Sequence, residues 1–464
     1  MVNKGELYSL WVDSKVATRM EWRNTGAVLM TGMVVISYRA GEFAKERGGS
    51  MTLKRVVVTG IGAVHPFGFG WTTLWKNILT NQSAIRPISR FDTEGLSCKV
   101  AACIQSFDPR DFGLGRRMEQ NDLCAQYAAA ALKLAIDDAA LDVQQEDKNN
   151  IGIMMGCSCG GASTLETSMQ RFLSEGEKKI KPWSIPRIMA NSPAALCARQ
   201  FGFGGPNLTI STACSSSTNA IGLSYGMIRS GEFSTMIAGG TEAPIVPHLV
   251  GGFGALGALA KEGDDGSAAT CRPFDVRRKG FVLGEGSVLL ILESLEHALS
   301  RNATIYGEIA GFASFCDVSH PVLPDMSGQE AARTMRHALT KAGISSAEVG
   351  YIHAHGTGTK AGDVMESRGI KLTFAADAEK IPISSSKGAV GHLLGSSGAA
   401  GTVMSLLALK QQILPPTVNL EEPDPECDLD FIPGKPREAK VEWALANSFG
   451  FGGNNACLVL RKYL

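Results

Sequence analysis

Hydrophobic positions in this chain fall into short runs rich in valine and isoleucine, which alternate with longer segments of helical periodicity. Residues 55–59 and 151–156 form runs of the first kind, and residues 122–137 between them have the spacing of a helix. Short buried strands that alternate with helices are typical of parallel α/β folds. The sequence therefore predicts an α/β class from residue 55 onward.

The same order of elements recurs later in the chain. Near Asn302 the pattern restarts with a strand that runs into glycine, then a helix over 328–342 and closing strands over 443–448 and 456–461. We therefore expect two similar halves, residues 51–302 and 303–464, related by element order and not by sequence identity. Helical segments over 163–203 interrupt the first half, which predicts a layer laid over the core.

Residues 1–50 have a different character, with mixed charges and a single apolar run at 27–37. That run is shorter than the ~20 residues that span a bilayer. Scattered acidic residues argue against a transit peptide. We expect a loosely ordered extension, with the folded domain starting at Met51.

The charge balance and the cysteines bear on the expected partners and on the cellular compartment. The 464 residues include 45 basic and 45 acidic side chains, so no net charge favours nucleic acid or an anionic membrane. Eleven cysteines show no CxxC pair and no regular spacing. We therefore predict reduced thiols in a cytoplasmic protein.

Cys214 lies where a β-branched run, residues 207–212, meets small polar residues and the start of a helical pattern. At such a junction the helix N–H groups and the positive dipole end favour a thiolate. A rigid helix is predicted from Ser215 to Arg229, with Ile221, Leu223, Met227 and Ile228 at spacings that suit burial. A buried structural thiol is the alternative for any single cysteine.

Three further stretches carry polar groups in glycine-rich settings. His353 and His355 end a predicted strand and point to one side by alternation, but no third ligand for a metal is at hand. Lys387 and His392 lie in an apolar segment that a structural role would also suit. Residues 447–455 form a glycine loop that could present N–H groups to an oxyanion.

Taken together, these motifs resemble the β-ketoacyl-acyl-carrier-protein synthases of the thiolase fold. The motifs are TACSSS, HAHGTGT, SSSKGAVGHLLG and NSFGFGGNN, in that order, and the similarity runs from about Arg55 to Arg461. Residues 251–255 and 280–286 resemble synthase II; synthase I and a polyketide-type ketosynthase are the alternatives. The resemblance implies a thiolase-like α/β fold, with two βαβαβαββ halves packed as an α-β-α-β-α core.

The resemblance also implies a reaction. It is a decarboxylative Claisen condensation of an acyl-carrier with malonyl-carrier to 3-oxoacyl-carrier, in fatty-acid chain elongation. The implied enzyme is a homodimer that binds acyl carrier protein and needs no metal or cofactor. Two other interpretations are a non-catalytic partner subunit, which the presence of Cys214 disfavours, and a degradative thiolase, which uses a second catalytic cysteine.

Roles for single residues follow from the same resemblance. Cys214 is the expected nucleophile, its N–H and that of Phe451 the oxyanion hole, and Phe451 also the gate. His355 and His392 are expected to donate hydrogen bonds to the thioester oxygen, near a Lys387–Glu366 pair. The expected substrate-binding residues are Thr357, Thr359, Cys159, Phe253 and Phe449, and the carrier-docking residues are Lys178 and Lys179.

Three positions depart from the family pattern. Cys159 is smaller than the usual aliphatic residue of the acyl pocket, which leaves chain-length preference open. Gly257 stands where the family has a further basic docking residue. His353 replaces a more usual Asn or Glu, and the sequence assigns it no role.

Overall fold

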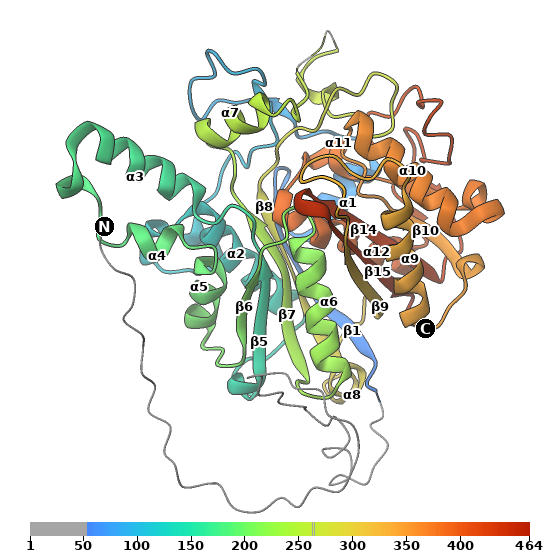
Figure 1. Cartoon of the computed structure of the whole chain (residues 1–464). Coiled ribbons are helices and arrows are strands. Elements are labelled where there is room, and N and C mark those ends of the chain that lie inside the picture. The colour runs from blue at the N-terminus through green and yellow to red at the C-terminus, as the bar shows by residue number, and fades with distance from the viewer. Residues whose placement is uncertain (1–52, 262, 264) are drawn as a thin grey trace, which may run out of the picture. The chain divides into compact units, whose positions relative to one another are not determined.

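Two sets of five strands join edge to edge in the central sheet of the computed structural model, which describes residues 53–261, 263 and 265–464 (Figure 1). The first set contains β1 (Val56–His65), β5 (Ile151–Gly156), β6 (Asn207–Ile210), β7 (Thr235–Glu242) and β8 (Gly286–Ser294). The second contains β9 (Gly307–Cys316), β10 (Val349–His353), β11 (Ile383–Ser384), β14 (Trp443–Gly450) and β15 (Asn454–Arg461).

The two sets have the same topology. Their orders are β6-β5-β7-β8-β1 and β11-β10-β14-β15-β9, with the first three strands of each order parallel and the last two pairings antiparallel. They meet where Val56–Val58 of β1 pair antiparallel with Gly307–Ile309 of β9. The predicted repeat of element order is therefore confirmed.

Helices form three layers around these strands. The clusters of buried apolar residues place α2 and α5 on the outer face of the first set, α6 and α12 between the two sets, and α9 and α10 on the outer face of the second. Their bounds are α2 (Leu123–Asp138), α5 (Ser192–Phe201), α6 (Ser216–Arg229), α9 (Gln329–Ala342), α10 (Lys360–Phe374) and α12 (Ser397–Gln411). This is the predicted α-β-α-β-α arrangement.

The central layer explains why α12 lacks a polar face. Every residue from Ser397 to Leu409 is buried, as expected for a helix that is packed on all sides. The helix α6 instead keeps one side free: Ile221 and Ile228 are buried, but Leu223 is 45% exposed. The prediction that all four apolar positions of this helix are buried is therefore wrong at Leu223.

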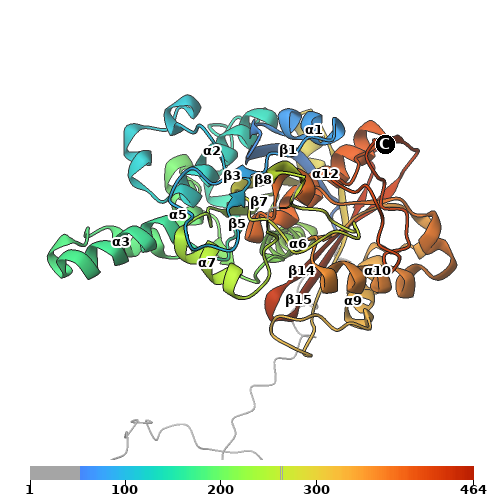
Figure 2. The ribbon, with the colours of Figure 1, turned by 90° about the horizontal axis from the view of Figure 1, so that it is seen from above.

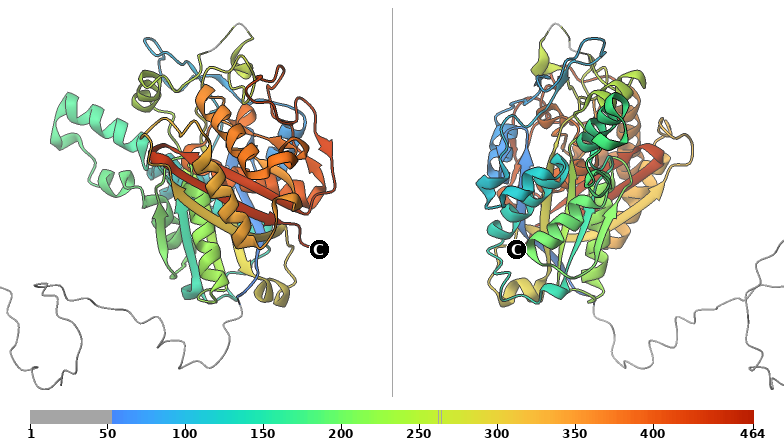
Figure 3. Two further views of the ribbon diagram at one scale, coloured as in Figure 1. Left: turned by 45° about the vertical axis from the view of Figure 1, so that its right-hand side comes forward. Right: turned by 90° about the vertical axis from the view of Figure 1, so that its left-hand side faces the viewer.

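An arm formed by α3 (Ala162–Glu175), η4 (Glu177–Lys179) and α4 (Ser184–Ile188) interrupts the first half. Figure 2 and the left view of Figure 3 show α3 extending away from the layers, with Ala162 as its one buried residue. The predicted layer over the core is therefore wrong for α3; of this segment, α5 packs on the core. The remaining helices are α1 (Trp71–Leu79), α7 (Pro247–Ala255), α8 (Leu295–Ser300) and α11 (Lys387–Val390). The remaining strands are β2 (Gly68–Phe69), β3 (Arg86–Pro87), β4 (Val100–Ala101), β12 (Ile413–Leu414) and β13 (Arg437–Glu438).

Within the residues that the structure describes, no helix is long and apolar enough to span a bilayer. The expected loosely ordered extension, residues 1–50, lies outside the described residues.

Candidate active site

Cys214 sits on a tight turn between β6 and α6, as predicted. Ala213 has a φ of 50°, a conformation that non-glycine residues rarely adopt. The turn is fixed from both sides, because Ser216 Oγ accepts the Thr212 N–H at 2.9 Å and Ser215 N–H donates to the Thr212 carbonyl at 3.2 Å. The thiol therefore lies at the start of a half-buried helix and is itself buried.

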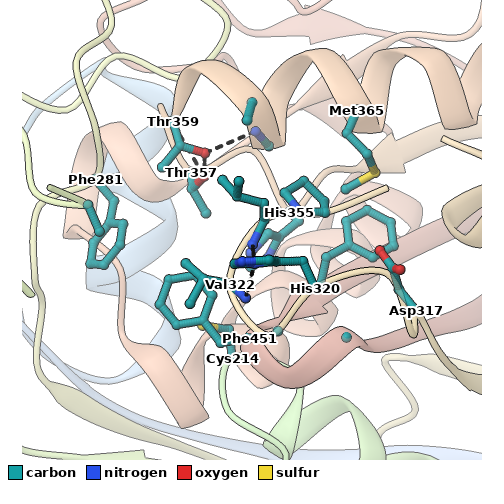
Figure 4. Close-up of a pocket in the computed structure, with 18 of the residues that line it drawn as sticks. Cys214, Phe281, Asp317, His320, Val322, His355, Thr357, Thr359, Met365 and Phe451 are labelled. Carbon is teal, nitrogen blue, oxygen red and sulfur yellow. Dashed lines mark hydrogen bonds between the residues drawn. The ribbon is translucent and has the colours of Figure 1, made fainter. Parts of the chain in front are cut away.

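The thiol faces a cavity of about 210 Å³ (Figure 4). Several residues singled out from separate motifs line it together: Cys214, His355, Thr357, Thr359, His392, Phe449 and Phe451. They come from the turn between β6 and α6, from the loop between β10 and α10, from the segment after α11, and from β14 and the turn that follows it. The fold thus brings distant parts of the chain to one cavity.

A cysteine and two histidines form the centre of this cavity. His392 Nε2 lies 3.0 Å from Cys214 Sγ, and its Nδ1 lies 2.7 Å from Ser397 Oγ. One nitrogen of His355 joins them, with the three ligand-type atoms all within 4.8 Å of one another. Among the described residues, His355 Nδ1 has no hydrogen-bond partner. Two imidazoles thus converge on the thiol from different elements.

Burial controls the charge of all three groups. It raises the pKa of Cys214 to about 11, although the charge of Lys387 and the N–H groups of Phe451 and Cys214 act in the opposite direction. The Cys214 N–H at the helix start thus favours a thiolate, but burial outweighs it. Burial, reinforced by Lys387, holds the pKa of both His355 and His392 well below the usual range, so both rings are neutral near pH 7.

The same three side chains have the donor types of a zinc site. A tetrahedral zinc ion would hold a thiolate sulfur and an imidazole nitrogen about 3.6 Å apart. The observed 3.0 Å between His392 Nε2 and Cys214 Sγ is instead a hydrogen-bond separation. This geometry suits proton exchange between thiol and imidazole better than it suits a shared metal.

Lys387 and Glu366 hold the His355 peptide between them. The Lys387 ammonium donates to the His355 carbonyl, whereas Glu366 accepts the His355 and Gly356 N–H groups, each at 2.8 Å. Among the described residues no direct ion pair joins the two side chains. The predicted pairing is thus an electrostatic one across the His355 backbone, and it fixes that backbone on both sides.

The glycine loop after β14 approaches the nucleophile closely. A Cβ on Gly450 would lie 2.8 Å from the Thr212 carbonyl oxygen and 3.1 Å from the Cys214 nitrogen. Only glycine allows this approach, which directs the Phe451 N–H, along with the Cys214 N–H, toward the sulfur. The arrangement offers two backbone donors to one oxygen atom bound beside Cys214.

A carboxylate of α10 holds the loop that carries Thr357 and Thr359. Buried Asp363 accepts the Thr357 N–H at 3.0 Å and the Gly358 N–H at 3.1 Å. The two threonine hydroxyls lie 2.9 Å apart, and Thr359 also caps the N-terminus of α10. Two hydroxyl groups are therefore held together on the cavity wall (Figure 4).

The structure places two of the predicted acyl-pocket residues behind the cavity, not on its wall. Cys159 and Phe253 pack against the apolar cluster that contains Cys214. Phe253 contacts Phe281 edge to face at 5.7 Å, and Phe281 contacts His392 in the same way at 5.1 Å. Phe253 therefore borders the nucleophile through intervening rings, whereas Cys159 packs against the same cluster.

The predicted docking lysines lie elsewhere. Lys178 and Lys179 are exposed on η4 in the projecting arm, and Lys179 Nζ contacts Glu175 Oε2 at 2.9 Å. Neither lines the cavity of its own chain, whereas Gly257 does.

Several cavity residues were missed from the sequence. Asp317 and His320 line the cavity but stand in a segment without a recognisable motif, and Phe281 lies in the 280–286 segment, which was assigned to the family pattern without a site role. Asp317 is held against the glycine loop, since its N–H donates to the Gly453 carbonyl at 2.8 Å. A Cβ on Gly453 would lie only 1.8 Å from the Asp317 carbonyl oxygen, a close approach of which the sequence shows only the glycine.

Fold and site together define an α/β protein of two repeated halves with a buried cysteine and two histidines at their junction. The family model described as the β-ketoacyl synthase N-terminal domain matches residues 53–298, and that of the C-terminal domain matches residues 306–421. The chain belongs to the β-ketoacyl synthase family, and the predicted resemblance is confirmed.

This chain is similar to relatives that carry a functional name, over most of the length of each protein. The chain is 42% identical to 3-oxoacyl-[acyl-carrier-protein] synthase 2 of Synechocystis, over 88% of this chain and 98% of that protein. It is 40% identical to the protein of the same name from Coxiella burnetii, over 89% and 99%. A solved ketosynthase in complex with a type II PKS acyl-carrier protein matches with a TM-score of 0.82 and 33% identity, over 89% and 100%.

Proposed function

We propose that this protein is a β-ketoacyl-acyl-carrier-protein synthase of the synthase II type. It joins an acyl-carrier to malonyl-carrier with loss of carbon dioxide and gives 3-oxoacyl-carrier in fatty-acid elongation. The observation that carries the proposal is the convergence of Cys214, His355 and His392 in one cavity. Relatives at about 40% identity bear the name of this activity.

The first half-reaction transfers the acyl group to Cys214. Sulfur attacks the thioester carbonyl, whose oxygen accepts hydrogen bonds from the Cys214 and Phe451 N–H groups. Because the resting thiol is protonated, its proton passes to His392 Nε2 at 3.0 Å and then to the departing phosphopantetheine sulfur. The products are acylated Cys214 and the free thiol of the carrier arm, and His392 is neutral again.

The second half-reaction uses the histidines as donors. Once its one proton has moved from Nδ1, beside Ser397 Oγ, to Nε2, neutral His392 donates together with His355 to the malonyl thioester oxygen. The carbon–carbon bond to the carboxylate then breaks and carbon dioxide leaves. The resulting enolate carbon attacks the acyl carbonyl on Cys214, which departs as a thiolate and takes up one proton. Neutral imidazoles suit this step, because an imidazolium beside the enolate carbon could protonate it.

The threonine hydroxyls and the arm lysines provide contacts for the carrier. Thr357 and Thr359 are placed to bind amide groups of phosphopantetheine on its way to Cys214. Lys178 and Lys179 are the exposed basic residues that bind the acidic carrier protein in this proposal. A related ketosynthase has been solved with its acyl-carrier protein, which supports a carrier as partner. The chemistry requires no metal or cofactor.

A second copy of this chain is the proposed neighbour of β6. This strand ends the sheet, and an unpaired strand edge is a template for pairing with another strand. Large exposed apolar side chains lie on β6, α6 and α3: Leu208, Leu223, Leu165, Met169, Phe172 and Leu173. In light scattering we expect a dimer that Leu208→Lys dissociates and Leu299→Lys, on exposed α8, leaves intact.

The compartment and the activity complete the proposal. All eleven cysteines carry free thiols, which suits a reducing cytoplasm.

The activity test supplies acyl-carrier and malonyl-carrier and follows 3-oxoacyl-carrier and carbon dioxide. Cys214→Ala should abolish the product, and Cys197→Ala, a buried cysteine of α5, should retain it. Product from acetyl-coenzyme A donors alone, with none from malonyl-carrier, would instead indicate a thiolase.

A further inference from the structure

His353 is a buried side chain beside the site to which the mechanism gives no task. Its Nε2 lies 3.3 Å from Ser386 Oγ, and its ring faces Gly401 of α12. A Cβ on Gly401 would lie 2.7 Å from His353 Nδ1. The ring therefore fills the space that a side chain at position 401 would otherwise need.

Both neighbours of the ring support groups of the site. Ser386 precedes Lys387, whose ammonium holds the His355 carbonyl. The helix α12 begins at Ser397, whose hydroxyl contacts His392 Nδ1. His353 thus lies between Ser386, next to Lys387, and the helix α12, whose Ser397 contacts His392.

The charges around His353 are those of the site itself. Lys387 acts on it, and it in turn acts on His355. On the α12 side, residues 397–409 contain no ionisable side chain, and the paired strand residues are Ser384 of β11 and Ala446 of β14. Burial lowers the pKa of His353 to about 3, so it carries no charge.

The carboxylates that act on Lys387 come from a single helix. They are Glu366 and Asp363, both on α10. Residues 397–409 of α12 add no carboxylate, and the charge of Lys387 favours the Cys214 thiolate against burial.

We propose that His353 is a positioning residue that packs the Ser386–Lys387 turn against α12 and places no carboxylate there, so that the positive charge of Lys387 acts on Cys214. The inference rests on the proposed role of Cys214 as nucleophile. It assigns residue 353 control over the pH range in which the thiolate forms.

The physical reason lies in the sign of the charge. A carboxylate at position 353 would compensate Lys387 and would also repel the thiolate, and a nearby charge of this kind changes a pKa by about 1 to 3. A neutral amide at the same position would do neither. Charge and packing can therefore be separated by choosing between His353→Glu and His353→Gln.

The test measures alkylation of Cys214 by iodoacetamide as a function of pH, with peptide mass mapping and a Cys214→Ala blank for the other cysteines. His353→Glu should alkylate about tenfold or more slowly at pH 9, because a thiol whose pKa is higher by about 1 has roughly a tenth of the thiolate at a pH below that pKa. His353→Gln should follow the parent profile. Equal profiles for both variants, or an equal displacement of both, would overturn the proposal.

Two further variants secure the outcome. Gly401→Ala presses a methyl group on the ring without adding charge, so it should lower the melting temperature and leave the pH profile in place; a displaced profile would contradict the charge argument. If His353→Glu does not fold, His353→Ala with Gly401→Glu supplies the carboxylate from α12 and should slow alkylation equally. Alkylation needs no condensation, so a failed activity assay does not affect this conclusion.

Discussion

Gly450 lies against the backbone of Cys214, with its Cα positioned so that an added methyl group would reach within 3.1 Å of the Cys214 nitrogen. The two residues are 236 positions apart in chain order, yet their contact decides where the Phe451 N–H points. The strand β14 and the turn before α6 are thereby joined into one donor pair for an oxyanion.

Gly450→Ala should therefore impair acylation without unfolding the protein. Gly450 has a φ of −110°, which alanine adopts freely, so only the contact with Thr212 and Cys214 is disturbed. Loss of one backbone donor corresponds to about 3 kcal/mol, or a rate lower by about 100-fold. Stopped-flow acylation measures this effect.

Gly452→Ala provides the control for this variant. Gly452 has a positive φ, so alanine there strains the loop, but its Cβ would meet only Asn454, at 3.2 Å. It should cost stability and change acylation far less. Equal loss of acylation in both variants would show that general loop strain, not the approach to Cys214, is responsible.

Glu366 should give the parent protein a pH-dependent stability near neutrality. Burial raises its pKa from 4.5 to about 7, so the folded state binds this proton more tightly than the unfolded state does. Its contribution is full below pH 4.5 and is lost as the pH rises through 7. Relative to Glu366→Gln, the parent should lose roughly 3 kcal/mol of unfolding free energy over this range.

Urea unfolding of both proteins between pH 4.5 and 8 provides the measurement. The exposed Glu379→Gln is a surface control that should follow the parent. A constant difference between parent and Glu366→Gln across the range would mean that this carboxylate is already ionised in the folded state at pH 5.

The sequence was sufficient for the fold class and the centre of the site, for identifiable reasons. The alternation of short apolar runs and helical patterns predicts the order of strands and helices, and Cys214 stands at a strand-to-helix junction that the sequence shows. Whether that thiol ionises depends on burial, which sequence alone does not give. The exposed Leu223 likewise reflects which surface remains uncovered in the single chain.

Contacts between loops were beyond prediction for a different reason. Asp317 carries no motif, and the 280–286 segment that contains Phe281 was given no site role; both residues reach the cavity because β9 and the segment before β8 end beside it. The Lys387–Glu366 relation was predicted as a pair, but both side chains bind the His355 backbone instead. Such choices depend on distances of a few ångströms between elements far apart in the chain.

Charge reversal on the arm should slow carrier-dependent transfer selectively. In the double variant Lys178→Glu and Lys179→Glu, transfer from acyl-carrier should slow mostly at low salt, because exposed charges are screened beyond about 10 Å at 0.1 M. Small acyl-coenzyme A donors should be unaffected. Lys435→Glu with Lys440→Glu is the matched control at exposed positions. Equal loss with both donors would refute docking on η4.

The two half-reactions should separate by mutation, because they use different atoms of the same cavity. Acyl transfer needs the Cys214 sulfur, whereas decarboxylation of malonyl-carrier needs donors on the thioester oxygen, which are assigned to His355 and His392. Cys214→Gln should abolish condensation and retain carbon dioxide release, since its amide resembles the acylated cysteine with an oxygen toward the Phe451 N–H.

His392→Ala should have the complementary phenotype. It removes the donor 3.0 Å from the sulfur, so carbon dioxide release should fall by about 100-fold or more. Acylation should persist at a reduced rate, because Lys387 and the two backbone N–H groups still favour the thiolate when the pH is raised. Carbon dioxide release and intact-mass acylation, measured on both variants at pH 7 and pH 9, distinguish the two steps. A folded Cys214→Gln that releases no carbon dioxide, or a His392→Ala that condenses at the parent rate, would refute this division of roles.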